Sequence, residues 1–200
     1  MVSLPLVAGF CVCLDKESML ITTILTIVVT MVVMIGFNAL YVAAEFATVA
    51  ARKTNISQMA ADGHRSAQRL LQFMEDSQAL DRYVAACQLG ITVSSLVLGA
   101  YGQNVIAPLL DGAAPWISTG VAITAVLALN TNLQVIMGEL LPKSIAVQFP
   151  ERVALAVLTP MIWSLRILKY PIKFFNGSGM LLLRLLGRKP KDGHGSVHSP

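Results

Sequence analysis

A glutamate, a glycine and a proline lie close together at the end of an apolar stretch, in QVIMGELLPKSIAV (residues 134–147). Pro142 has no amide hydrogen, so the carbonyl of Gly138, four residues earlier, loses its helical donor. Such a carbonyl is tolerated at membrane depth only where it faces protein or a water-filled cavity. Beside the Glu139 carboxylate it offers a second oxygen of the kind that hard cations such as Mg²⁺ bind. The motif is therefore typical of a cation site, or else Glu139 pairs with Lys143 one turn later.

The first long apolar stretch carries its own polar positions. Asn38, Val42 and Glu45 are spaced by four and three residues, which places them on one face of a helix. Asn38 lies about 10 Å from Glu45 along the axis. Asn38 either offers an oxygen to a cation or makes a hydrogen bond to a neighbouring helix. A carboxylate inside a membrane segment is a functional hypothesis by default, although Glu45 can also pair with Arg52 near the helix end.

The second and third apolar stretches add neutral oxygens. In ACQLGITVSSLVLGAYGQN, small and hydroxyl residues allow close helix packing, but Ser94 or Ser95 can also supply an oxygen opposite Glu139. Asn130 and Asn132 precede Glu139 by about two turns and can line the same cavity. Because three helices enclose a cavity poorly, we expect a homodimer.

The composition places these residues in a membrane. The 200-residue chain is 55% hydrophobic and 13% charged, against about 25% charged in soluble domains. Apolar stretches at about 19–49, 84–110 and 115–141 each exceed the ~20 residues that a spanning helix needs. The fold class that we predict is an all-α integral membrane protein with three transmembrane helices.

The remaining segments flank these spans. Residues 1–18 are apolar but too short to cross a bilayer, and we expect them on the extracytoplasmic side. The polar, amphipathic residues 51–83 indicate helices with a break near Asp62 and Gly63. Residues 151–186 are apolar but interrupted by basic residues and prolines, which favours juxtamembrane helices along the cytoplasmic membrane surface. Residues 188–200 form a polar tail without globular content.

The basic residues predict the orientation. With three spans, fourteen of the fifteen fall on one side of the membrane, which the positive-inside rule assigns to the cytoplasm. We therefore expect a multi-pass protein of the cell membrane with its N-terminus outside and its C-terminus inside. The fourteen are Arg52, Lys53, Arg65, Arg69, Arg82, Lys143, Arg152, Arg166, Lys169, Lys173, Arg184, Arg188, Lys189 and Lys191.

The sequence lacks the usual signs of an enzyme. It contains no P-loop, no G-x-S-x-G and no H-E-x-x-H. Its three histidines fall in loops or in the tail, and none is paired with a nucleophile. We expect neither catalysis nor a nucleic-acid partner.

Three segments together resemble a known family. NALYVAAEFATVAARKTNISQMAADGHRSA, DRYVAACQLGITVSSLVLG and GELLPKSIAVQFPERVAL are similar, in order and spacing, to the transmembrane domain of the CNNM/CorC magnesium transporters, also known as the hemolysin C-like family. The resemblance covers residues 19–187. It implies a dimer with three transmembrane helices per subunit, Mg²⁺ bound near mid-membrane, and Na⁺-coupled export.

The resemblance also implies a set of site residues. The family's glycine–glutamate pair falls on Gly138 and Glu139, and the polar position of its first helix falls on Asn38. Gly90 matches the glycine of the second-helix motif, but Ile91 stands where asparagine is frequent, so Ser94 and Ser95 are the nearest oxygen donors. The first-helix motif S-x-S-E reads VAAE here, which removes two hydroxyls.

Two further expectations concern the CBS domains of the family and the alternative to a transport function. Family members usually continue into CBS domains that bind ATP, which we expect to be absent from these residues. The alternative to a transporter is a non-transporting membrane scaffold or regulatory protein of the same fold, in which the polar residues only join helices. A secreted pore-forming toxin does not fit the one-sided basic charge.

Overall fold

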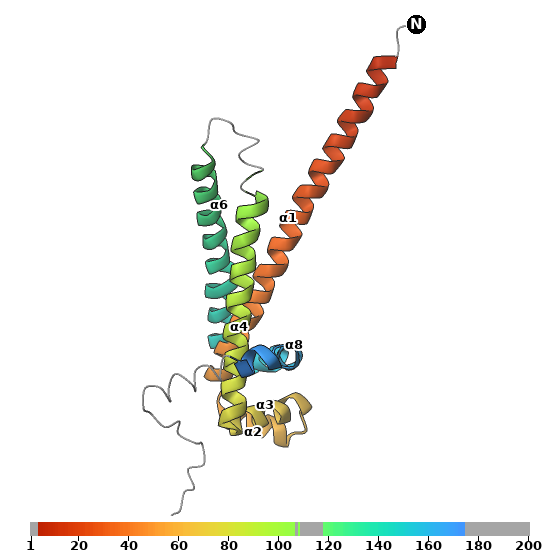
Figure 1. The fold of residues 1–200 in the computed structure, drawn as a ribbon. Coiled ribbons are helices and arrows are strands. Elements are labelled where there is room, and N and C mark those ends of the chain that lie inside the picture. The colour runs from red at the N-terminus through yellow and green to blue at the C-terminus, as the bar shows by residue number, and fades with distance from the viewer. Residues whose placement is uncertain (1–3, 107, 109–117, 175–200) are drawn as a thin grey trace, which may run out of the picture.

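The computed structural model describes residues 4–106, 108 and 118–174, and every element in that part of the chain is helical. Three long helices run side by side or diverge from one end, where the shorter helices gather (Figure 1). The elements are α1 (Leu4–Ala50), α2 (Lys53–Ala61), α3 (Arg65–Glu75), α4 (Ser77–Tyr101), the π-helix η1 (Gly102–Ile106), α6 (Thr119–Leu133), the π-helix η2 (Gln134–Leu140), α7 (Leu141–Gln148) and α8 (Pro150–Ile167).

Three helical stretches are long and apolar enough to cross a bilayer: Ile21–Ala50, Ser77–Ile106 and Ile123–Gln148. The first lies within α1, the second joins α4 to η1, and the third joins α6, η2 and α7. The predicted fold class, an all-α membrane protein with three transmembrane helices, is confirmed.

The ends of these helices differ from the sequence-based boundaries. Helix α1 begins at Leu4, so residues 4–18 of the N-terminal apolar segment belong to the same helix as the first span, which begins at Ile21. The third span passes Pro142 and reaches Gln148. Pro142 occupies the first turn of α7, where a missing amide hydrogen costs little.

The short helices form one end of the molecule, which we call the base: α2, α3, α7 and α8. The turn between α2 and α3 falls at the predicted break. Gly63 there has a φ of +91°, a conformation that a residue with a side chain rarely adopts. The amides of Gly63 and His64 close the end of α2 by donating to the carbonyls of Ala60 and Met59.

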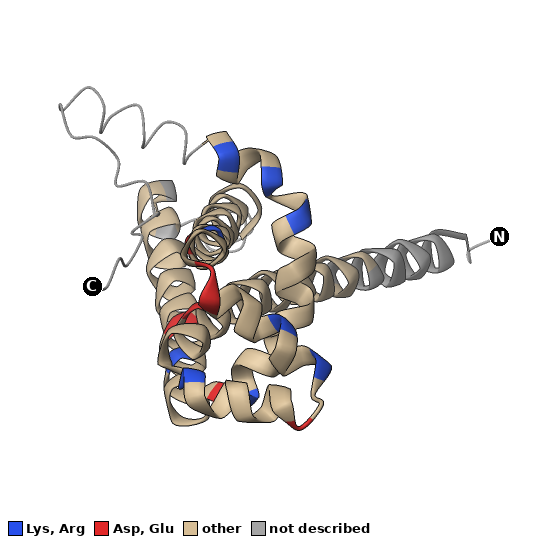
Figure 2. Ribbon diagram, turned by 90° about the horizontal axis from the view of Figure 1, so that it is seen from below, with Lys and Arg blue, Asp and Glu red and all other residues tan. Residues whose placement is uncertain are grey.

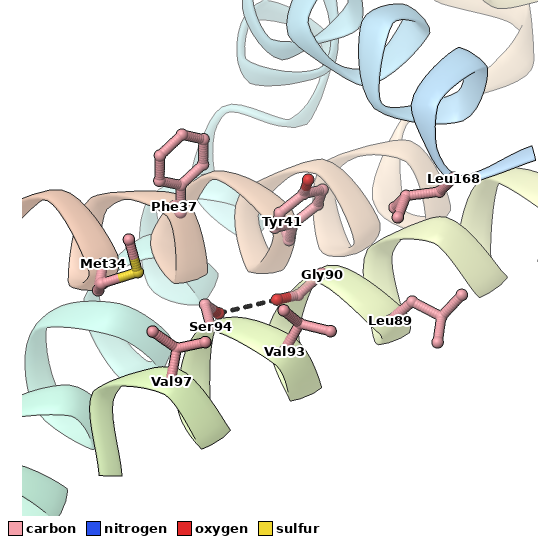
Figure 3. Close-up of a pocket in the computed structure, with 9 residues that line it drawn as sticks. All are labelled: Met34, Phe37, Tyr41, Leu89, Gly90, Val93, Ser94, Val97 and Leu168. Carbon is pink, nitrogen blue, oxygen red and sulfur yellow. Dashed lines mark hydrogen bonds between the residues drawn. The ribbon is translucent and has the colours of Figure 1, made fainter. Parts of the chain in front are cut away.

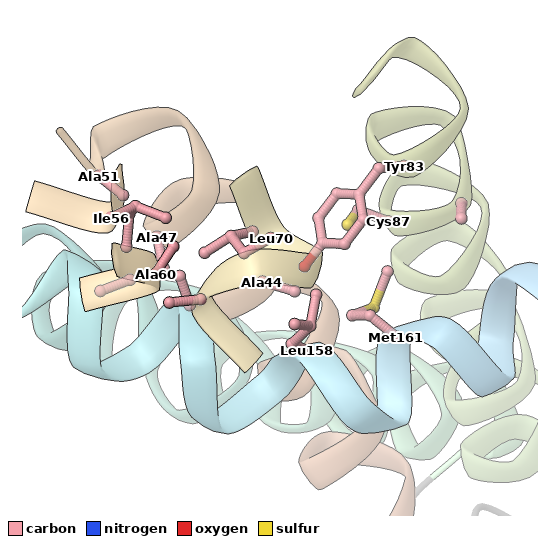
Figure 4. Close-up of a cluster of buried hydrophobic side chains, with 14 of the residues drawn as sticks. Ala44, Ala47, Ala51, Ile56, Ala60, Leu70, Tyr83, Cys87, Leu158 and Met161 are labelled. Carbon is pink, nitrogen blue, oxygen red and sulfur yellow. The ribbon is translucent and has the colours of Figure 1, made fainter. Parts of the chain in front are cut away.

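The base holds the hydrophobic core (Figure 4). The small side chains of Ala44 and Ala47 in α1, and of Ala51 just after it, are buried there and let the other helices approach closely. The rest of this core comes from Ile56, Ala60, Ala67, Leu70, Tyr83, Ala86, Cys87, Ala146, Ala154, Leu158, Met161 and Ile172.

The spanning segments, in contrast, bury little within one chain. Only 6% of the most apolar window of the first span is buried, and 33% and 17% of the other two. Apolar side chains such as Val32, Leu96 and Leu129 are mostly exposed, as expected of surfaces that face lipid. The described basic residues from Arg52 to Lys173 lie on the elements of the base and beside it (Figure 2).

Candidate functional site

Three helices meet through buried polar groups at the middle of the bundle. Asn38 of α1 is 1% exposed, and its Nδ2 donates to the Gly138 carbonyl of η2 at 3.2 Å. The hydroxyl of Ser94, on α4, lies 2.9 Å from Oδ1 of Asn38 and 2.8 Å from the Gly90 carbonyl. We call Asn38, Ser94, Gly90 and Gly138 the polar junction.

Two glycines make the junction possible. A Cβ atom on Gly138 would lie 2.9 Å from Nδ2 of Asn38, too close for the present packing. A Cβ atom on Gly90 would lie 2.4 Å from the ring of Tyr41, which rests against the α4 backbone (Figure 3). The Tyr41 hydroxyl shares a hydrogen bond of 2.9 Å with Ser164 of α8, which ties the junction to the base.

The carbonyl that Pro142 was expected to release does have a partner outside its own helix, the amide of Asn38. It belongs to η2, whose wider π-helical turn is a feature that often marks functional sites. Gly138 is therefore held in place by a side chain of another helix, and its carbonyl keeps a second lone pair.

Glu139 follows Gly138 directly and is half-buried. The alternative ion pair with Lys143 does not form, because the Lys143 ammonium lies over the ring of Phe46, 4.4 Å from its centroid. In the described residues, ion pairs join only Lys53 to Glu75 and Arg82 to Asp76. Glu139 is thus next to Gly138 in sequence, and its carboxylate has no basic partner in the described part of the chain.

A ladder of amides continues from the junction along the third span. Gln134, one turn before Gly138, donates from Nε2 to the hydroxyl of Ser95. Asn130, one turn further, donates to the Leu98 carbonyl at 3.0 Å, and its buried Oδ1 has no hydrogen-bond partner in the described structure. Sequence reasoning missed Gln134, although its spacing of four from both Asn130 and Gly138 was a usable signal.

Two other sequence candidates lie elsewhere. Asn132 is exposed and donates to the Ala128 carbonyl of its own helix. Glu45 lies near Gln88 and Cys87, toward the base. It makes no ion pair with Arg52 in the described structure.

The junction has the chemistry of a site for a hard cation. Its candidate ligands are an amide oxygen, backbone carbonyls and a hydroxyl, and Glu139, the residue after Gly138, carries a carboxylate; all of these ligands are oxygens. Octahedral Mg²⁺ with bonds of ~2.0–2.1 Å places neighbouring ligand oxygens ~2.9 Å apart. In this structure Ser94 Oγ and Asn38 Oδ1 are held 2.9 Å apart by their hydrogen bond, an ordinary distance for such a bond.

Comparison with known proteins gives a consistent picture. A family profile described as the cyclin M transmembrane N-terminal domain, CNNM, matches residues 28–200. The chain is 35% identical to the UPF0053 protein YrkA of Bacillus subtilis over 89% of its length and 41% of that protein. It is 38% identical to YugS of the same organism, over 78% of this chain and 37% of that one.

A mycobacterial relative has a similar identity to this chain and a similar coverage. The chain is 33% identical to the uncharacterized protein Rv1841c of Mycobacterium tuberculosis, over 84% of its length and 49% of that protein. The chain thus spans less than half the length of these curated relatives.

Proposed function

The chain belongs to the CNNM family, that of the cyclin M transmembrane N-terminal domain, and from this premise we propose that it is the ion-carrying membrane domain of a Mg²⁺ transporter. The observation that carries the proposal is the polar junction. Neutral oxygens from three helices meet there beside Glu139, a carboxylate without a basic partner among the described residues.

In this proposal Glu139 supplies the negative charge, and Asn38, Ser94 and the Gly138 carbonyl supply neutral oxygens. An arriving Mg²⁺ replaces the hydrogen bonds that these groups make to one another. Pairing with a cation offsets the cost of a carboxylate inside the membrane, roughly 2.5–3.5 kcal/mol for a charged group at a helix centre. Gly90 contributes space and a carbonyl that orients Ser94.

We further propose that transport is Na⁺-coupled export by a homodimer. The family resemblance supplies the coupling and the direction. The low burial of the three spans within one chain supports a partner subunit, since a membrane helix that encloses an ion needs neighbours on several sides.

One observation favours the alternative, a scaffold or regulatory protein that moves no ion. The polar groups of the junction already satisfy one another across α1, α4 and η2. Such bonds stabilise a helix bundle by themselves, at ~0.6–2 kcal/mol each.

Flux through reconstituted protein separates the two functions. Liposomes that contain the chain and a Mg²⁺-sensitive dye should show Mg²⁺ flux with wild type and with the control Glu75→Gln, an exposed carboxylate of the base. Flux should be lost with Glu139→Gln. Equal flux with Glu139→Gln would reject the role of this carboxylate, and wild-type flux no greater than that of empty liposomes would favour the scaffold.

A further inference from the structure

An apolar crevice lies between α1 and α4, on the side of the bundle opened by the small residue Gly90 (Figure 3). Its volume is about 250 Å³, below the roughly 300–1,000 Å³ of pockets for drug-sized ligands. It extends about 12 Å along α4, from Leu89 to Val97, at 1.5 Å per residue. We define the crevice by its lining residues, Met34, Phe37, Tyr41, Leu89, Gly90, Val93, Ser94, Val97 and Leu168.

The two polar side chains in this lining already have partners. The Ser94 hydroxyl bonds to Gly90 and Asn38, and the Tyr41 hydroxyl bonds to Ser164. An occupant therefore needs no hydrogen-bonding group inside the crevice. A narrow, flexible hydrocarbon chain meets that requirement.

The base end of the crevice is different. Leu168, which follows α8, lines that end, and Lys169 is the next residue. Residues 152–174 contain Arg152, Arg166, Lys169 and Lys173 but no acidic residue. The two lysines are exposed, and no ion pair engages them in the described structure.

Aromatic residues surround these lysines at the same end. Trp163 and Tyr170 are 61% and 81% exposed, an arrangement typical of the interface between lipid and water. Arg166 lies near the face of Trp163, 5.9 Å from the ring centroid. The apolar lining is suited to an acyl chain of a phospholipid. The aromatic and basic residues at the base end are suited to its interfacial region and its phosphate.

We propose that the crevice binds an anionic phospholipid of the leaflet that faces the base. One acyl chain lies between α1 and α4, and the phosphate lies at Lys169 and Lys173. Since Tyr41 and Ser94 line the crevice and also belong to the junction or contact it, the bound lipid holds α1 against α4. The crevice shares Ser94 and Gly90 with the junction, but the inference does not rest on the proposed function, because lipid binding is measured without Mg²⁺.

Native mass spectrometry of the delipidated full chain tests the proposal, with phosphatidylglycerol and phosphatidylcholine of identical acyl chains. We expect a preference for phosphatidylglycerol. Lys169→Gln/Lys173→Gln should weaken its binding by roughly fivefold for each lysine and leave phosphatidylcholine unaffected. The control Arg152→Gln, at the other end of α8, should change neither.

The crevice itself is tested with Val93→Phe, which fills it, and with Leu96→Phe, on the exposed side of the same helix. Val93→Phe should reduce the binding of both lipids, and Leu96→Phe should reduce neither. Unchanged binding with Val93→Phe would overturn the proposal. Loss of a dimer with that variant would also overturn it, because the occupant would then be a second copy of the chain.

A measurement on the unaltered chain covers the case in which Val93→Phe fails to fold. Phosphatidylglycerol with a photoreactive group at the end of one acyl chain should crosslink to peptides that contain Met34, Phe37 or Val97. Crosslinks confined to other faces, such as the exposed side of α6 at Leu129, would reject the assignment.

Discussion

The contact between Asn38 and Gly138 depends on one missing methyl group. Gly138→Ala would place a Cβ atom 2.9 Å from Nδ2 of Asn38, so the Asn38 side chain must move away and its hydrogen bond to the Gly138 carbonyl is disturbed. We expect a destabilisation of about 1–3 kcal/mol, as for overpacking elsewhere, together with reduced Mg²⁺ binding. The melting temperature of the purified chain and a Mg²⁺ titration measure the two effects.

Gly36→Ala is the matched control, because Gly36 lies on α1 and a Cβ atom there meets nothing within 4 Å. It should leave stability and binding near wild type. If the two alanine variants behave alike, the close approach of Asn38 to Gly138 is not what holds the junction together.

Residue types and spacing predicted part of this site. Asn38, Ser94, Gly90 and Gly138 were expected near one another, and the structure brings them into contact. Sequence alone could not assign the partners, because they depend on the rotation of each helix about its axis. That rotation places Lys143 over Phe46 instead of beside Glu139, and turns Asn132 away from the junction.

At the scale of elements, Pro142 lets η2 and α7 follow one another without a hydrogen bond from residue 142 to Gly138. We propose that the helices tilt at this point when access alternates between the two sides of the membrane. Pro142→Ala restores an amide hydrogen that competes with Asn38 for the Gly138 carbonyl. We expect equal or higher thermal stability and severalfold slower Mg²⁺ flux in liposomes, whereas unchanged flux would argue against a hinge at residue 142.

Helices α2 and α8 are joined by a bond whose strength depends on pH. Asn55 donates to the Glu151 carboxylate at 2.8 Å. The pKa of Glu151 is lowered, first by its own backbone amide near the start of α8 and then by Asn55. A lowered carboxyl pKa adds stability above the unfolded value, near 4.5, and this stability is lost as pH falls through the folded value.

Glu151→Gln should therefore be less stable than wild type at pH 7, by less than about 1 kcal/mol because the carboxylate is solvent-facing. The difference should vanish below the folded pKa. Melting temperatures of both proteins between pH 7 and 3 measure this. A difference that stays constant down to pH 3 would show that charge on Glu151 is not responsible.

The order of the helices could be predicted from the apolar stretches and the turn residues. The ends of the helices could not. Gly63 marked the turn between α2 and α3 because few other residues adopt its conformation. The extension of α1 back to Leu4 and of the third span to Gln148 was not predicted. Charged residues interrupt the apolar pattern in both regions, at Asp15, Lys16 and Glu17 and at Lys143. Pro142 is tolerated because a new helical turn begins there.

At the scale of the whole molecule, the packed core lies at the base and the spans face outward. The base also carries the described basic residues from Arg52 onward (Figure 2). The positive-inside rule then predicts that the base is cytoplasmic. The opposite end, at Ser118, would lie outside the cell.

Cysteine labelling in intact cells tests this orientation, with Cys11 and Cys13 replaced by alanine and the buried Cys87 retained. A membrane-impermeant maleimide should label Ser118→Cys in intact cells, and Ser57→Cys, an exposed position of α2, only after permeabilisation. The reverse pattern would invert the topology.

Calorimetric Mg²⁺ binding to the detergent-purified chain tests the central claim, that the junction and Glu139 form an ion site. The account predicts saturable binding by wild type and by Glu75→Gln, and its loss in Glu139→Gln with the melting temperature of the metal-free protein unchanged. Equal binding by wild type and Glu139→Gln, or binding by neither, would contradict it and leave the junction as a set of bonds between helices.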